Sequence, residues 1–183
     1  MMILAFAGEL CLITALFFAI YSLKRHPALS KPAVLTLGLV LGFIAVTASM
    51  GASRYLGDTA IIGWHDWASY WSKTVAMPLY LCTLLWLWSN GPRPLTVAFA
   101  ALGTSPVLGA PALLTDLALV LTLLRLIQCC APKSQLIAAL IALGLVPLCA
   151  LLPEPDLAMG LFHLALALHF VLIGCFIQQQ KAA

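Results

Sequence analysis

The chain has 183 residues, of which 63% are hydrophobic and only 8% are charged, and its formal net charge is +3. Soluble domains carry about 25% charged residues, so this composition excludes a water-soluble globular fold. The small positive charge does not indicate nucleic-acid binding, and no nucleic-acid partner is expected. Apolar runs of about 18 or more residues recur along the chain, and each is long enough to cross a hydrocarbon core roughly 30 Å thick.

These runs predict an all-α, polytopic membrane bundle in a single domain covering residues 1–183. Unpaired backbone amides are costly in lipid, so spans must be helices or barrel strands, and continuous apolar runs exclude the alternating pattern of barrel strands. The first run lacks a basic n-region and a cleavage site, which predicts a retained span. Segments rich in proline and glycine separate seven predicted spans, at residues 2–23, 32–53, 69–89, 94–109, 112–130, 134–152 and 157–178.

The second predicted span carries small residues on one helical face, and this spacing favours close contact with another helix. They are Gly38, Gly42, Ala45, Ser49 and Ser53.

The third predicted span begins beside an aromatic cluster and carries polar residues at helical spacing. Trp and Tyr gather at membrane interfaces, which is the environment that we predict for Trp64, Trp67, Tyr70 and Trp71. A regular helix would place its polar residues along one side that faces protein, at Asp66, Ser69, Lys73, Tyr80 and Thr83. Prolines inside the third and sixth spans predict bends at Pro78 and Pro147.

The distribution of basic residues predicts the orientation, because Lys and Arg are enriched in cytoplasmic loops. With the N-terminus outside, seven of the nine basic residues lie at cytoplasmic ends, which favours an N-out, C-in arrangement. Only Arg54 and Lys73 then lie outside. All six carboxylates fall in the outer half of the protein under this arrangement.

Three ionisable residues share a shallow depth near the outer surface: Glu9 in the first span, Asp116 in the fifth and His163 in the seventh. At about 1.5 Å per residue, each lies of the order of 10 Å or less from the outer end. Such groups are costly in lipid unless they face protein or water, so they are candidates for function. We expect them to converge on one outer pocket together with Ser49, Arg54, His65, Asp66 and Lys73.

Three interpretations of this pocket remain open. Structural ion pairs would have Lys73 or Arg54 neutralising Glu9 or Asp116. A metal site would use imidazole and carboxylate, with His163 as a ligand, and would activate a water molecule for hydrolysis. A transport or ligand-binding site is the third. His169 lies about 120° around the helix from His163, so the two cannot easily share one metal ion, and His169 is expected to be structural.

The arrangement of polar residues along the chain resembles that of the CREST superfamily. The shared features are an acid in the first span, a serine and a basic residue at the end of the second, an aspartate at the start of the third and a histidine in the seventh. The matching positions are Glu9, Ser49, Arg54, Asp66 and His163. That superfamily includes the alkaline ceramidases, so the resemblance implies seven spans, zinc and lipid amidase activity. The chain departs from the ceramidase pattern at two of the three expected zinc ligands.

For function, the sequence favours a membrane-embedded binding or partner protein with an outer-leaflet polar pocket. A metal-dependent lipid hydrolase of the CREST type and a small transporter are the alternatives. The inner halves of the spans hold few polar residues, which favours a one-sided site over a channel. The expected partners are membrane lipid and either another membrane protein or a second copy of the chain. The compact loops suggest the bacterial inner membrane.

Overall fold

The computed structural model describes residues 3–26, 31–88, 134–149 and 151–179. These residues form helices and short connections only, as the apolar runs predict. The elements are α1 (Ile3–Lys24), α2 (Lys31–Tyr55), α3 (Ile62–Trp71), the π-helix η1 (Ser72–Ala76), α4 (Met77–Trp88), α7 (Ser134–Gly144), α8 (Val146–Cys149) and α9 (Pro155–Gln179). The fourth and fifth predicted spans, at 94–109 and 112–130, lie outside the described residues.

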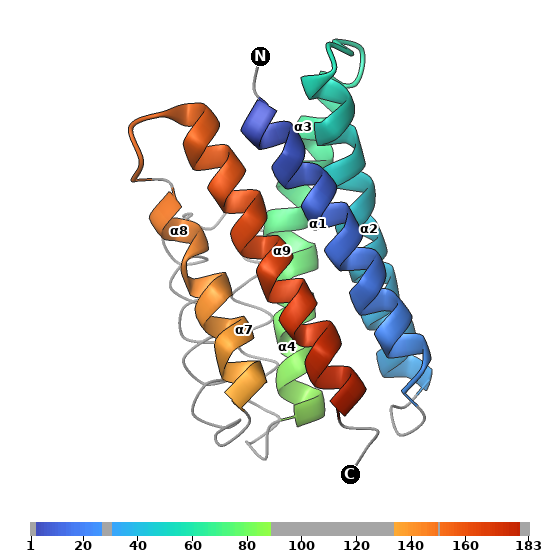
Figure 1. Cartoon of the computed structure of the whole chain (residues 1–183). Helices are drawn as coiled ribbons and strands as arrows, with labels where there is room; N and C mark the ends of the chain where they lie inside the picture. Colours follow the sequence, from blue (N-terminus) through green and yellow to red (C-terminus); the bar gives the residue numbers. More distant parts are fainter. Residues whose placement is uncertain (1–2, 27–30, 89–133, 150, 180–183) are drawn as a thin grey trace.

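The helices α1, α2 and α9 are the three described helices long and apolar enough to cross a membrane. They run side by side, with α1 between α2 and α9 (Figure 1). The pair α7 and α8 packs on α9, and α4 packs on α2. The start of α1, the connection between α2 and α3 and the start of α9 meet at one end of the bundle (Figure 1). That end is the one predicted to face outward.

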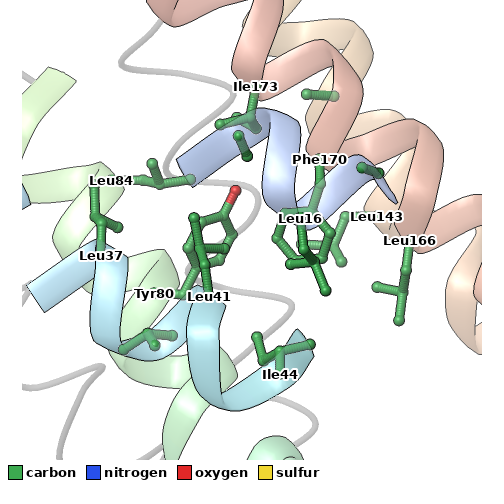
Figure 2. Close-up of a cluster of buried hydrophobic side chains, with 14 of the residues drawn as sticks. Leu16, Leu37, Leu41, Ile44, Tyr80, Leu84, Leu143, Leu166, Phe170 and Ile173 are labelled. Carbon is green, nitrogen blue, oxygen red and sulfur yellow. The ribbon is translucent and has the colours of Figure 1, made fainter. Parts of the chain in front are cut away.

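Apolar side chains from α1, α2, α4, α7 and α9 form one continuous core. Figure 2 shows Leu16 of α1, Leu41 of α2, Tyr80 of α4, Leu143 of α7 and Phe170 of α9 within it. Burying an apolar side chain of this size stabilises a protein in water by about 1.5–3 kcal/mol. Inside lipid that gain disappears, so close packing and interhelical hydrogen bonds matter more.

The small-residue face predicted for α2 coincides with its packing face only in part. A Cβ added to Gly38 or Gly42 would meet no described atom within 4 Å, and Ser49 is exposed. The buried face shares Ala45 with the predicted face but otherwise runs through Ala48 and Ala52. Gly38 and Gly42 therefore make no close contact within the described elements, because small size permits close contact but does not choose the partner helix.

The third predicted span starts earlier than expected, because α3 begins at Ile62 and contains the aromatic cluster. A π-helical segment, η1, follows before α4. Pro78 has no N–H to donate to the carbonyl of Thr74, and the wider π turn accommodates this missing bond. Because a π turn rotates the residues after it, the predicted polar side is split: Tyr80 is fully buried, whereas 64% of the Asp66 side chain is exposed.

The sixth predicted span is interrupted, as its proline predicts. Helix α7 ends at Gly144, Leu145 forms a turn, and α8 follows with Pro147 inside its first turn. A proline in the first turn of a helix costs no hydrogen bond, because a backbone N–H at that position would have no acceptor within the helix.

Candidate functional site

The buried centre of the site is a contact between Glu9 of α1 and His163 of α9. Glu9 Oε1 lies 3.3 Å from His163 Nε2, and the two residues are only 2% and 7% exposed. Glycines make the contact possible by letting the helices approach closely. A Cβ added to Gly8 would lie 2.9 Å from the His163 Cβ and 3.0 Å from the backbone oxygen of Gly160. The predicted convergence of Glu9 and His163 is therefore seen in the structure.

Helices α2 and α3 close the site around the Glu9 carboxylate. A Cβ added to Gly51 of α2 would lie 2.0 Å from Glu9 Oε1 and 3.1 Å from His65 Nε2 of α3. The missing side chain at Gly51 thus provides the space in which the carboxylate sits. The His65 Nε2 also lies 3.3 Å from Ser69 Oγ, one helical turn further along α3.

Three buried polar atoms of this group have no hydrogen-bond partner among the described residues: Glu9 Oε2, His163 Nδ1 and His65 Nδ1. The backbone of Ala5 lies close to the His163 ring but does not complete a hydrogen bond to Nδ1. Folded proteins satisfy most of their buried polar atoms, so an unused carboxylate oxygen beside an unused imidazole nitrogen requires an explanation. An additional bound species is one such explanation.

The rim of the site carries a surface ion pair. Arg54 at the end of α2 lies 3.5 Å from Asp66 of α3, with 44% and 64% of their side chains exposed. Asp66 Oδ1 is also 3.6 Å from His65 Nδ1, which is too long for a hydrogen bond. Arg54 therefore pairs with Asp66 rather than with Glu9, and Asp116, the other carboxylate considered as its partner, lies outside the described residues.

The remaining predicted site residues lie apart from the Glu9–His163 contact or outside the description. Ser49 is exposed, and its Oγ donates to the backbone oxygen of Ala45 at 2.8 Å. Lys73 is exposed within η1. Asp116 lies outside the described residues.

Two cavities in the described part of the chain lie away from the Glu9–His163 contact. A groove of about 640 Å³ lies between α1 and α9, with apolar lining that includes Phe18 and Leu168. A second, of about 330 Å³, lies between α1 and α2 near Leu23 and Leu35. Neither of these two is lined by Glu9 or His163, which form a closely packed polar contact within the described part of the chain.

Two features of the site did not stand out in the sequence. Gly51 resembles any other small residue of the second span, although it follows Ala48 at the spacing of the true packing face. Asp156, in the first turn of α9, accepts a hydrogen bond from the backbone N–H of Ala5 at 3.3 Å. This bond satisfies an amide in the first turn of α1, which has no partner within its own helix. The sequence shows that an acidic residue stands in the first turn of the last helix. It does not show that this residue accepts a hydrogen bond from another helix, or from which one.

Among the His, Cys, Asp and Glu side chains that the structure describes, no group of three is arranged to hold a metal ion. Comparison of the chain with protein-family models, with curated proteins and with solved structures found no match.

Proposed function

We propose that this chain is a seven-span protein of a bacterial inner membrane, oriented N-out and C-in, which binds a small ligand at Glu9 and His163 and does not catalyse a reaction. The Lys and Arg asymmetry supports the orientation. Three helices long enough to span a membrane, among those that the structure describes, support the location. The ligand site then lies toward the outer leaflet.

The main support for this proposal is that Glu9 Oε2 and His163 Nδ1 are buried without hydrogen-bond partners among the described residues, although the two side chains contact each other. A purely structural pair would use its polar atoms within the protein, as His169 of the same helix does through hydrogen bonds to Tyr80 of α4 and Ala139 of α7. The contrast between two buried histidines of α9 supports a binding role for His163.

The chemistry of the free atoms indicates the ligand class. A carboxyl oxygen without a proton accepts hydrogen bonds, and a neutral imidazole accepts at the nitrogen that carries no proton. With its carboxylate buried and Arg54 paired to Asp66, the site favours a small cation or a hydrogen-bond donor such as an ammonium group. Close packing at Gly51 restricts the ligand or the ligand group to a small size.

The test is a ligand series on the purified protein in detergent, with sodium, ammonium, ethanolamine and zinc ions as probes and thermal unfolding as the readout. A ligand that binds only the folded protein raises the unfolding midpoint. We expect at least one probe to stabilise the wild type and to lose this effect in Glu9→Gln. Glu154→Gln makes the same chemical change at an exposed position near the same end and should respond like the wild type.

The outcome decides between the proposed functions. Equal responses of the wild type and Glu9→Gln to every probe would contradict the binding proposal. Specific stabilisation by zinc, lost in both Glu9→Gln and His163→Ala, would favour the lipid-hydrolase alternative that the CREST resemblance implies. The observation favouring that alternative is that imidazoles from α3 and α9 both lie near one buried carboxylate.

A further inference from the structure

A second polar group lies in the middle of the bundle, far along α9 from the start of that helix. Tyr80 of α4 and His169 of α9 are both fully buried. The Tyr80 hydroxyl lies 2.8 Å from His169 Nε2, and His169 Nδ1 lies 2.6 Å from the backbone oxygen of Ala139 in α7. Three helices are thus joined by two consecutive hydrogen bonds through one imidazole ring.

The direction of both bonds follows from the acceptor at one end. A carbonyl oxygen only accepts, so the proton of a neutral His169 ring is on Nδ1 and donates to Ala139. Nε2 then accepts from the Tyr80 hydroxyl. Both ring nitrogens are satisfied, in contrast to His163.

The Tyr80 side chain links two parts of the bundle that otherwise have little direct contact. Among the described elements, α4 packs mainly against α2, whereas α9 packs against α1, α7 and α8. The Tyr80 ring lies among Leu41, Leu84 and Phe170 in the core (Figure 2). It makes edge-to-face contacts with His169 and Phe170, with ring centroids 5.5 and 5.4 Å apart.

We propose that the chain of hydrogen bonds from Tyr80 through His169 to Ala139 is a joint that sets the register of α4 against α7 and α9. Aliphatic contacts with the surrounding leucines are not directional, so they select a register less strictly than hydrogen bonds do. The hydrogen bonds of Tyr80 and His169, by contrast, form in only one register. Sliding α4 by one helical turn of about 5.4 Å would separate the hydroxyl from Nε2 and leave both unpaired in an apolar core.

The test combines amide hydrogen exchange with a double-mutant cycle on the full chain. Tyr80→Phe keeps the ring but leaves His169 Nε2 without a donor, so we expect about tenfold faster exchange in α4 (Met77–Trp88), with smaller changes in α1. Tyr70→Phe removes the hydroxyl of an exposed tyrosine on α3 and is the matched control. It should exchange like the wild type.

The cycle adds His169→Leu and the double variant Tyr80→Phe/His169→Leu. If the joint acts as one unit, the double variant should lose less stability than the two single variants added together, because no polar ring atom then remains unpaired. If Tyr80→Phe cannot be purified in a folded form, recovery by the double variant supports the joint. Additive losses, no such recovery, or uniform exchange changes in all helices would overturn the proposal.

Discussion

Replacing Gly51 by alanine should displace the Glu9 carboxylate without removing any charge. The new Cβ would lie 2.0 Å from Glu9 Oε1, whereas real Cβ atoms essentially never approach closer than 3.0 Å, so the oxygen must move by at least about 1 Å. A movement of that size straight toward His163 would shorten the 3.3 Å contact to about 2.3 Å, below any N–O hydrogen-bond distance. Because the carboxylate is the end of a flexible side chain, we expect it to move in Gly51→Ala and to alter its contact with His163.

The size of the effect follows from two opposing contributions. Alanine is favoured over glycine in a helix interior by about 1 kcal/mol, which stabilises the variant. Overfilling a packed site costs about 1–3 kcal/mol. Gly42→Ala is the matched control, because Gly42 lies on the same helix and its new Cβ would meet no described atom. It should therefore gain the helix-propensity stabilisation without the cost of overfilling. We expect Gly51→Ala to be about 1–3 kcal/mol less stable than Gly42→Ala.

Two measurements check this prediction. Equilibrium unfolding in detergent compares the stabilities of the two variants. Nitrogen-15 NMR of the histidine rings reports the surroundings of His163 directly, and its signal should shift in Gly51→Ala and in Glu9→Gln but not in Gly42→Ala. Equal stabilities together with an unchanged His163 signal in Gly51→Ala would refute the packing argument.

Three further predictions concern other parts of the molecule. Gly174→Ala should destabilise the α1 and α9 interface by about 1–3 kcal/mol in thermal unfolding, because its Cβ would lie 2.5 Å from the Phe18 ring; a stability equal to wild type would contradict this. Arg54→Ala should cost less than about 1 kcal/mol by the same measurement, because its ion pair is exposed, and a larger loss would show a buried role. Reporter fusions should place Lys181 in the cytoplasm and residues 59–65 outside, and an external C-terminus would reverse the proposed orientation.

The helical class of this protein and the approximate positions of its described helices follow from the sequence alone. Continuous apolar runs leave the backbone no way to satisfy its amides in lipid except by helix formation, and prolines interrupt those runs at predictable places. The break between α7 and α8 at Leu145, beside Pro147, illustrates this local control. The pairing of Glu9 with His163 was also predictable, because both are ionisable and share one depth.

Tertiary structure alone decided which residues surround that pair. Gly51 provides the space for Glu9 only because α2 presents the face carrying Ala48 and Ala52, and the sequence offered Gly38 and Gly42 as an equally plausible face. In a chain that is apolar all round, hydrophobic periodicity does not distinguish the packed side of a helix from the lipid-facing side. The choice depends on the summed packing and polar contacts with neighbouring helices, and these form only when distant segments meet.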